Sequence, residues 1–384
     1  MAKAKPKPKL AIIMTGGGAR AAYQVGVLKA IGEYLKKGAP SPFTIICGTS
    51  AGAINAAGLA VRADRYNMAV RQLNLIWSNF TSDQVFRTDG LGIAKTGAHW
   101  LLTMMLGGLG KHSPMYLLDR RPLRKLLERY LSGDVYRASI ESGALDALCV
   151  SASGYSSHQS VSFFNGGSRL NHWKRAKRIG LAADITVDHL MASSAIPFLF
   201  QPQKINREYF GDGSMRQTAP ISPALHLGAE RILIIGNRME KDPELPRVSD
   251  PDFPSVGEIA GHAMDSIFLD SLDADIERLQ RINRTIDIIN ENQKIKHGIN
   301  LRHVDVEVIY PSKDLGALAQ QYAHELPWTL RALMRGLGVY SKPNSSLMSY
   351  LLFERGYCNA LIDLGYQDAQ NKREEIEQFL EENI

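Results

Sequence analysis

Short apolar runs alternate with glycine-containing segments and helical patterns at the start of the chain. After each glycine segment, apolar side chains recur every three or four residues, which is typical of a helix that packs on one side. The order is an apolar run at 10–14, glycines at 16–18, a helical pattern at 19–37, an apolar run at 43–47, Gly-Thr-Ser-Ala-Gly at 48–52 and a helical pattern at 53–63. This order of strand, glycine loop, helix, strand, tight turn and helix predicts a parallel α/β sheet.

The rest of the chain continues the alternation of strands and helices. Between Ser255 and Asn290, apolar residues at steps of three to five positions predict a long amphipathic helix packed on the sheet. Its spacing drifts from a strict heptad, so a paired coiled coil is the less favoured interpretation. The other predicted elements are mainly peripheral helices at 64–135, adjacent strands at 147–157 and 159–167, a helix at 188–199 that Pro197 bends or ends, strands at 231–235 and 304–310, and a surface helix near the C-terminus.

Composition places the chain among globular proteins. With 384 residues and 45% hydrophobic content, it can bury the core of one large domain or two ordinary ones. Its three cysteines are too few and too scattered to predict a disulfide framework or a metal cluster, which favours a reducing compartment. We expect no cofactor and no metal.

The net charge of +6 is partly concentrated in residues 1–9, where four lysines alternate with alanine and proline. This composition predicts a flexible basic tail, and a solvated terminus is a simpler interpretation than a site for nucleic acid or anionic lipid. Elsewhere acidic and basic residues intermix without a nucleic-acid-binding motif, so we expect no nucleic-acid partner.

No apolar run resembles a secretory signal or reaches the roughly 18–20 residues that a membrane span requires. This predicts a cytoplasmic protein that at most lies on a membrane surface. Residues 98–110 are apolar and rich in glycine. A buried helix followed by a loop is favoured there over a mobile apolar lip above a lipid site.

The segment Gly48-Thr49-Ser50-Ala51-Gly52 has the G-x-S-x-G spacing of a nucleophile elbow. It lies directly after a predicted strand and before a predicted helix, which is the context that such an elbow requires. Only small residues fit beside the serine in so tight a turn, and the following helix N-terminus favours developing negative charge. Ser50 is therefore a candidate nucleophile.

A second glycine segment, Thr15-Gly16-Gly17-Gly18-Ala19-Arg20, also lies between a strand and a helix. Its spacing formally fits a dinucleotide-binding loop, but the acidic residue expected about 20 positions later is missing. It is not a phosphate-binding P-loop, because no Gly-Lys-Ser/Thr follows. Glycines do suit the exposure of backbone N–H groups to an oxyanion. Arg20 is expected to steady this loop, to attract an anionic headgroup, or simply to form a surface ion pair.

Asp212 lies between Gly211 and Gly213 after a predicted strand, so its carboxylate is a candidate base for Ser50. By itself an aspartate between glycines is usually a turn residue. A Ser-His-Asp triad would need a histidine, and those after Asp212 are His226, His262, His297, His303 and His324. None has a motif context, and an α/β-hydrolase places several strands before its elbow, so a Ser-Asp dyad is the simpler interpretation.

Four segments together resemble the patatin-like phospholipase family: GGGAR at 16–20, GTSAG at 48–52, MASSAIPFLFQP at 191–202 and DGS at 212–214. The resemblance covers roughly residues 10–225, and it is specific because the segments agree jointly. Two positions differ from the family pattern. Ala21 and Ser214 stand where the family usually has glycine, or glycine or alanine, and both are small enough to leave the chemistry unaffected.

The resemblance implies a three-layer α/β/α fold with a mainly parallel central sheet, and the hydrolysis of acyl esters in lipids. It implies a metal-independent dyad of Ser50 as nucleophile and Asp212 as base, with an oxyanion hole at Gly16, Gly17 and Gly18. Supporting positions are Arg20, Gly48, Gly52 and Gly213. The predicted organisation is a basic tail at 1–9, a patatin-like core at 10–225, and a C-terminal part at 226–384 with a long helix, further strands and surface helices packed on the core.

Several functions are compatible with this sequence. The expected one is a serine acyl-ester hydrolase of the phospholipase A, lysophospholipase or esterase type, with a lipid or acyl-ester substrate. An acyltransferase would use the same acyl-enzyme with an alcohol or thiol as acceptor. A regulatory protein would keep the fold without turnover, which the intact dyad and glycine loop disfavour.

Overall fold

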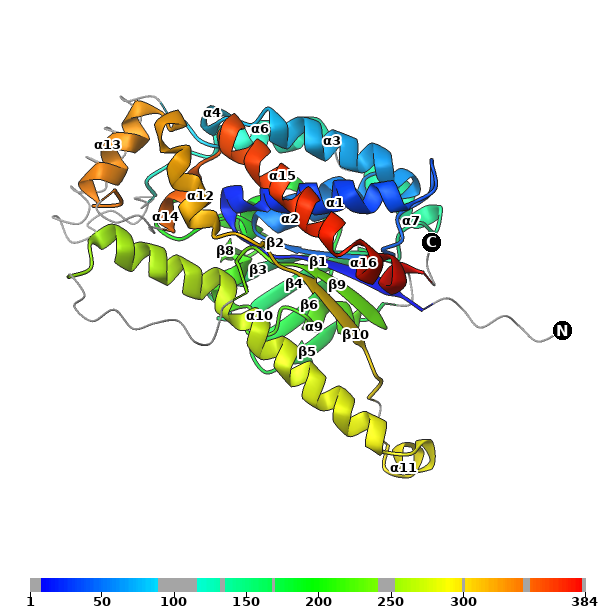
Figure 1. Cartoon of the computed structure of the whole chain (residues 1–384). Coiled ribbons are helices and arrows are strands. Elements are labelled where there is room, and N and C mark those ends of the chain that lie inside the picture. The colour runs from blue at the N-terminus through cyan, green and yellow to red at the C-terminus, as the bar shows by residue number, and fades with distance from the viewer. Residues whose placement is uncertain are drawn as a thin grey trace.

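A computed structural model describes residues 8–88, 116–131, 135–167, 170–240, 253–298, 301–340 and 346–381. Ten strands of these residues form one sheet, in the order β10-β9-β1-β2-β3-β4-β6-β5, with β8 paired to β3 and β7 paired to β8 (Figure 1). The strands are β1 (Leu10–Met14), β2 (Ile45–Thr49), β3 (Ala147–Gly154), β4 (Ser160–Gly166), β5 (Trp173–Arg175), β6 (Arg178–Ala182), β7 (Gln203–Ile205), β8 (Glu208–Asp212), β9 (Arg231–Ile235) and β10 (Asp305–Ile309).

The centre of the sheet is parallel. Strands β10, β9, β1, β2 and β3 run in one direction, whereas β4 and β8 are both antiparallel to β3. The side chains of β1 alternate between two buried clusters, one on each face of the sheet. A strand that is buried on both faces has a continuous apolar sequence, which accounts for the run LAIIM. The predicted mainly parallel α/β class is confirmed.

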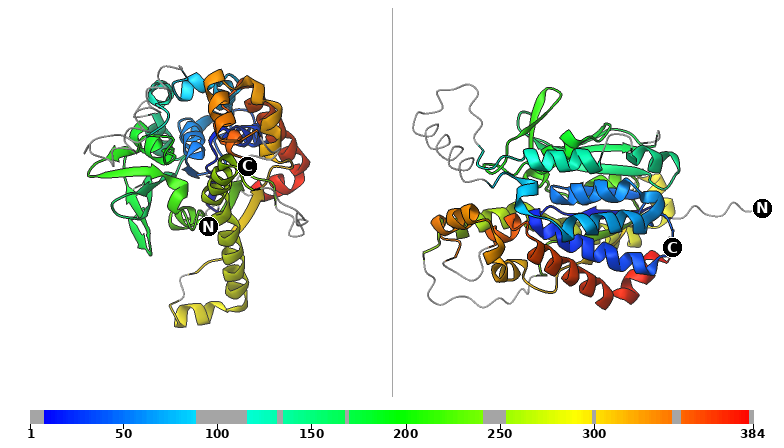
Figure 2. Two further views of the ribbon diagram at one scale, coloured as in Figure 1. Left: turned by 90° about the vertical axis from the view of Figure 1, so that its left-hand side faces the viewer. Right: turned by 90° about the horizontal axis from the view of Figure 1, so that it is seen from above.

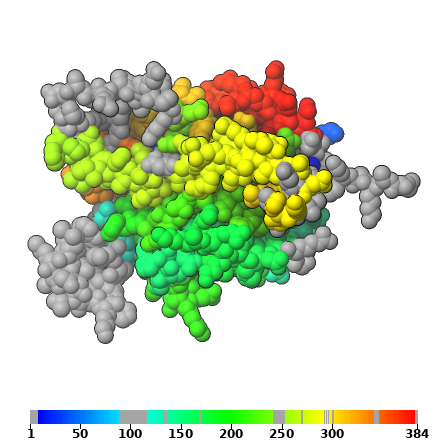
Figure 3. Space-filling view, turned by 90° about the horizontal axis from the view of Figure 1, so that it is seen from below, coloured from blue at the N-terminus to red at the C-terminus, as the bar shows by residue number. Residues whose placement is uncertain are grey.

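Helices cover both faces, which gives three layers. On one face lie α1 (Ala22–Tyr34), α2 (Ala51–Ala60), α3 (Tyr66–Ser78) and α15 (Arg355–Asn371); on the other lie α9 (Ser222–His226) and α10 (Val256–Ile288). Figure 2 shows α1, α3 and α15 side by side across the first face. Figure 3 shows α10, in yellow, running across the opposite face.

The other helices of the described residues surround these layers. They are α4 (Ser82–Val85), α6 (Arg121–Tyr130), α7 (Val135–Glu141), α8 (Val187–Ser193), α11 (Glu291–Lys296), α12 (Leu315–Gln321), α13 (Trp328–Gly336), α14 (Leu347–Leu351) and α16 (Arg373–Leu380), with short 3-10 turns at Gly18–Ala21, Ala63–Arg65, Gly213–Arg216 and Ala323–Glu325. No described helix has the length and apolar character needed to pass through a bilayer.

The segment after residue 225 contributes directly to the sheet and its covering layer. Strand β9 pairs with β1 along its whole length, and α15 packs against α1. These two helices approach so closely that a β-carbon at Gly26 would lie 2.0 Å from the carbonyl oxygen of Ile362. The Tyr23 hydroxyl donates a 3.0 Å hydrogen bond to Asp368 across the same contact.

Several predicted boundaries differ from the structure. The first helix starts as a 3-10 turn and ends at Tyr34, and the second strand is Ile45–Thr49 rather than 43–47. That strand continues into the elbow motif because Gly48 and Thr49 still pair with β3. Helix α8 ends at Ser193, four residues before Pro197, because a proline within a helix has no N–H for the carbonyl group four residues earlier and its ring clashes with that carbonyl. The apolar segment 98–110 lies outside the described residues.

Candidate active site

Ser50 lies in a tight turn between β2 and α2. Its φ is 54°, a left-handed conformation that non-glycine residues rarely adopt. Such backbone strain costs roughly 1–3 kcal/mol and persists only where the surroundings enforce it. Here a β-carbon at Gly52 would lie 2.2 Å from the carbonyl oxygen of Met14, and one at Gly48 would lie 2.5 Å from the Ala53 Cα. Both glycines of the predicted elbow are therefore required by the close approach of α2 to β1 and β2.

Asp212 is the last residue of β8, and its side chain faces Ser50. The Ser50 hydroxyl donates a 2.6 Å hydrogen bond to Asp212 Oδ2. The other carboxylate oxygen, Oδ1, accepts the Ser214 N–H at 2.9 Å. Because β3 pairs with both β2 and β8, it brings together two residues that are 162 positions apart in the sequence. A β-carbon at Gly213 would lie 2.2 Å from the Ser151 carbonyl oxygen, so this position also requires glycine.

Both side chains of this pair are almost completely buried, with 1% of Ser50 and 0% of Asp212 exposed. Burial raises the pKa of Asp212 to about 6, because a carboxylate loses its hydration in the interior. Hydrogen bonds from Ser50 and Ser214 and the positive charge of Arg120 lower this pKa again in part. Asp212 is thus a stronger base than an exposed aspartate, while still mostly ionised at neutral pH.

Among the described contacts, the Ser50 hydroxyl meets a carboxylate and no imidazole. His226 stacks on the Trp173 ring, and burial lowers its pKa to about 4. His303 lies between Asp287 and Asp305 at the surface. His189, in α8, bonds to Thr186 at the start of its own helix.

The glycine loop lies against Ser50. A β-carbon at Gly16 would lie 2.9 Å from the Ser50 Cβ, so no larger residue fits between the loop and the serine. Gly18 has a φ of 56°, and a β-carbon there would lie 2.2 Å from the Tyr350 carbonyl oxygen. Gly17 faces Asn237, whose side-chain nitrogen would lie 2.6 Å from an added β-carbon.

Asn237 holds this loop from behind, and the sequence analysis did not single it out. Its side-chain amide donates to the carbonyl oxygens of Gly16 (2.5 Å) and Thr15 (3.0 Å). Gln24 donates to the same Thr15 carbonyl at 2.8 Å. These bonds fix the carbonyl groups of the loop. Asn237 follows Gly236, just after β9 ends. Its position at the end of a predicted strand was the only sequence signal that pointed to it.

Ser193 is a second residue that sequence reasoning missed as an individual position. Its hydroxyl accepts the Ser50 N–H at 2.8 Å and donates to the Ser151 carbonyl at 2.6 Å. It thereby connects the elbow to β3. Ser193 belongs to the segment MASSAIPFLFQP that carried part of the family resemblance, so the structure supplies a physical role for that segment.

Arg20 is buried, with 4% of its surface exposed, so it forms no ordinary surface ion pair. Its Nε donates to Ser349 Oγ at 2.8 Å, and its Nη1 lies 3.3 Å from Asp265 Oδ1. The guanidinium group also lies 4.1 Å from the centre of the Tyr350 ring. Helices α10 and α14 therefore hold the Arg20 side chain in place. Of the three roles considered for Arg20, these contacts support the steadying of the glycine loop.

Residues 12–225 match the family model described as patatin-like phospholipase, which is more than half of the chain. The chain belongs to the patatin-like phospholipase family. No curated protein matches the sequence.

Among solved structures, this patatin-like chain is similar to VipD from Legionella pneumophila, with 11% identity, a TM-score of 0.32, and coverage of 93% of this chain and 67% of that chain. It is also similar to human GIVD cytosolic phospholipase A2, with 12% identity, a TM-score of 0.45, and coverage of 98% and 60%. The type III effector ExoU shows 16% identity, a TM-score of 0.29, and coverage of 93% and 54%. The chain thus spans about 60% of the length of the human enzyme.

An apolar cavity adjoins the Ser-Asp pair of this patatin-like domain. Gly18 and Ser50 belong to its lining, and most of the rest comes from apolar side chains of α2, α3 and α6, including Ile54, Leu73, Ile76, Leu123 and Leu127. The cavity is narrow, about 70 Å³. An apolar space beside a polar nucleophile suits the hydrocarbon part of an acyl group.

The described residues contain no group of three or more histidine, cysteine, aspartate or glutamate side chains arranged to hold a metal ion. The three cysteines are buried free thiols.

Proposed function

We propose that this chain is a serine acyl-ester hydrolase acting on lipids through a Ser50-Asp212 dyad. The observation that carries the proposal is the buried 2.6 Å hydrogen bond from the Ser50 hydroxyl to Asp212, beside a cavity lined mainly by apolar side chains. A nucleophile with its base within hydrogen-bond reach is the geometric signature of covalent catalysis. The family supports a lipid acyl ester as the substrate class.

The first step forms an acyl-enzyme. As Ser50 Oγ attacks the ester carbonyl carbon, its proton passes to Asp212 Oδ2, with which it already shares a hydrogen bond. The carbonyl oxygen becomes an oxyanion, and backbone N–H groups of Gly16, Gly17 and Gly18 are proposed to stabilise it. When the tetrahedral intermediate collapses, the carbon–oxygen bond to the alcohol part breaks, and Asp212 returns its proton to that leaving group.

The second step releases the fatty acid. Water enters in place of the alcohol, Asp212 accepts a proton from it, and the resulting hydroxide attacks the acyl carbon. Ser50 then leaves as the alkoxide and takes the proton back from Asp212.

Metal-independent catalysis, cytoplasmic location and contact with a membrane surface stay predictions from the sequence.

A phospholipid digestion tests this function. The purified protein, incubated with phosphatidylcholine in mixed micelles, is expected to release free fatty acid and a lysophospholipid, both measurable by mass spectrometry. A parallel incubation with an added alcohol separates hydrolysis from acyl transfer. If an acyl ester of that alcohol forms in place of free fatty acid, the chain is an acyltransferase. If neither product forms with phospholipids, lysophospholipids or simple esters, the hydrolase proposal is wrong.

The pH dependence is a separate prediction. Since Asp212 must be ionised to accept the Ser50 proton, and its pKa is raised to about 6, kcat/KM should be constant above that pH and fall below it. The fall approaches tenfold per pH unit, so activity at pH 5 should be about a tenth of the plateau. An aspartate with an ordinary pKa near 3.9 would leave activity at pH 5 almost unchanged.

The measurement uses a neutral, non-titrating ester, with fatty-acid release followed directly and the fold checked by circular dichroism at each pH. Full activity at pH 4.5 would contradict the raised pKa of Asp212.

A further inference from the structure

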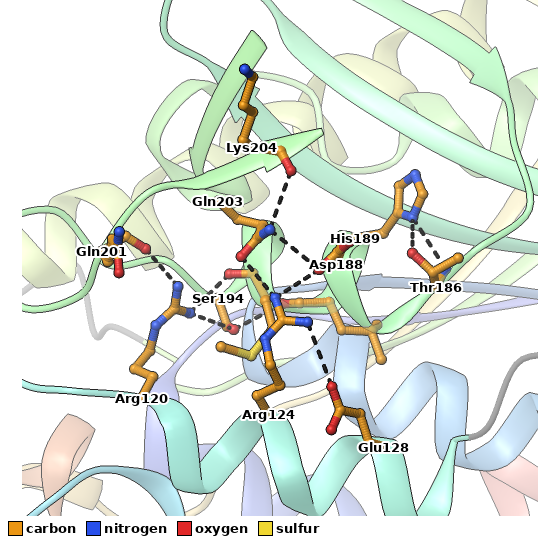
Figure 4. Close-up of polar contacts among 12 residues, drawn as sticks. Arg120, Arg124, Glu128, Thr186, Asp188, His189, Ser194, Gln201, Gln203 and Lys204 are labelled. Atoms are coloured by element: carbon orange, nitrogen blue, oxygen red, sulfur yellow. Dashed lines mark hydrogen bonds and ion pairs between the residues drawn. The ribbon is translucent and has the colours of Figure 1, made fainter. Parts of the chain in front are cut away.

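A second cavity, of about 360 Å³, lies against a different face of α6 from the apolar cavity. Unlike the apolar cavity, this cavity is lined by several charged side chains. Four are basic and one is acidic: Arg120, Arg121, Arg124, Lys204 and Asp119. Figure 4 shows Arg120 and Arg124 projecting from α6 and its start toward the segment that carries Gln201, Gln203 and Lys204. Neither the proposed dyad nor the proposed oxyanion loop accounts for this concentration of positive charge.

Two of the four cations already have carboxylate partners. The Arg121 Nε donates to Asp119 at 2.7 Å, and one terminal nitrogen of Arg124 lies 2.7 Å from Asp188. The other two, Arg120 and Lys204, have no carboxylate partner among the described residues. The Lys204 ammonium lies 5.9 Å from the centre of the Tyr209 ring.

Arg120 is the more unusual of these two, because only 5% of it is exposed. Among the described residues, its terminal nitrogens donate to neutral acceptors, which are the carbonyl oxygens of Met191 (2.8 Å) and Gln201 (2.7 Å) and the hydroxyl of Ser194 (3.2 Å). Its buried Nε has no hydrogen-bond partner in the part of the chain that the structure describes. A buried cation is costly unless an anion compensates it. The charge of Asp212 acts on Arg120 only at a distance and without a hydrogen bond.

We propose that this cavity binds a phosphate group. A phosphate monoester carries a charge of about −1.5 to −2 at neutral pH and three strong acceptor oxygens, which match the two cations that lack a carboxylate partner. Arginine is well suited to such a group, because its planar guanidinium presents several N–H donors. A carboxylate ligand offers one charge and two acceptor oxygens, fewer than a phosphate group offers to the same donors. Because α6 lines both cavities, the occupant lies next to the helix that walls the proposed acyl cavity.

Binding of inorganic phosphate, measured by calorimetry at constant ionic strength with acetate as the competing small anion, tests this site independently of hydrolysis. We expect one phosphate per chain and much weaker binding of acetate. Lys204→Gln should weaken phosphate binding about tenfold, which is typical of losing a charge-assisted hydrogen bond. Arg124→Gln should also weaken it, because Asp188 then loses its 2.7 Å partner and leaves a negative charge beside the cavity. Lys174→Gln is the matched control, since Lys174 is an exposed residue of the edge strand β5 that does not line the cavity.

Thermal unfolding of each variant serves to check that the fold is retained. Arg120 also supports residues 191–201, so the two more exposed positions carry the test. The proposal is overturned if the wild-type protein does not bind phosphate, if acetate binds equally well, or if Lys204→Gln and Arg124→Gln bind phosphate like Lys174→Gln.

Vesicles distinguish the source of the phosphate group. Sedimentation with phosphatidylcholine vesicles, with and without phosphatidic acid, is compared for the same variants. Binding that rises with phosphatidic acid and falls in Lys204→Gln but not in Lys174→Gln supports a lipid headgroup as the occupant. Binding of inorganic phosphate together with equal sedimentation of all variants supports a soluble phosphate ester. Because phosphate binding requires no turnover, failure of this proposal is distinguishable from failure of the proposed hydrolase.

Discussion

Asp212→Asn should lower the rate of ester hydrolysis by a factor of about 10² to 10⁴ while leaving the protein folded. This is the usual contribution of a general base. The amide keeps the shape of the carboxylate, and its oxygen can still accept the Ser214 N–H that now bonds to Oδ1 at 2.9 Å. What the variant loses is the ability to take the proton of the Ser50 hydroxyl. The measurement is kcat/KM with a soluble ester at pH 8, where the wild-type carboxyl is ionised.

Asp275→Asn provides the matched control for this variant. Asp275 is also buried, its pKa is also raised by burial, and it also accepts a backbone N–H, that of Ile221 at 3.0 Å. It lies in α10, and its partners among the described residues are Ile221 and Arg278 rather than a serine, so its amide variant should keep most of the activity. If Asp212→Asn retains wild-type activity, or if a single histidine variant is as inactive as Ser50→Ala while folded, the dyad is wrong and a triad is the better interpretation.

Gly18→Ala is expected to lower kcat by about 10² to 10³, the effect of losing one oxyanion-hole donor. An alanine at this φ of 56° is strained, and its methyl group would lie 2.2 Å from the Tyr350 carbonyl oxygen. The loop or α14 must therefore move. Because Gly18 lines the apolar cavity together with Ser50, the displacement reaches the position where the oxyanion would form.

Gly38→Ala separates backbone strain from the loss of loop geometry. Gly38 also has a positive φ, of 80°, but an added β-carbon there would meet nothing within 4 Å. Its alanine variant should lose roughly 1–2 kcal/mol of stability from the left-handed conformation and keep its activity. A folded Gly18→Ala variant with wild-type kcat would contradict the proposed role of the glycine loop.

Much of the fold could be predicted because it depends on local patterns. The run LAIIM and the glycines after it predicted a buried strand and a loop, and the structure has β1 and the 3-10 turn at Gly18 in these places. The G-x-S-x-G spacing likewise predicted a tight turn, in which Ser50 has a φ of 54°. The predicted boundaries were less accurate. Strand β2 extends to Thr49 because it pairs with β3, and the sequence at the end of a strand does not show which distant strand pairs with it.

The surroundings of the site could not be predicted, because they come from contacts between distant segments. The partners of Arg20 lie in α10 and α14, and Ser349 is 329 positions away in the sequence. Asn237 reaches the glycine loop from a position 221 residues later. No spacing rule connects such residues, since the order of strands in the sheet and the packing of helices around it bring them together. The same holds for Arg120, whose burial depends on its packing against residues 191–201.

The most direct test of the account is covalent labelling of the nucleophile. A fluorophosphonate reacts with an activated serine, so the wild-type protein should gain one adduct, and peptide mass spectrometry should place it on Ser50. Ser50→Ala should lose both the adduct and ester hydrolysis, and Asp212→Asn should be labelled far more slowly. Labelling at another serine that persists in Ser50→Ala, together with retained hydrolysis, would contradict the central claim that Ser50 is the catalytic nucleophile.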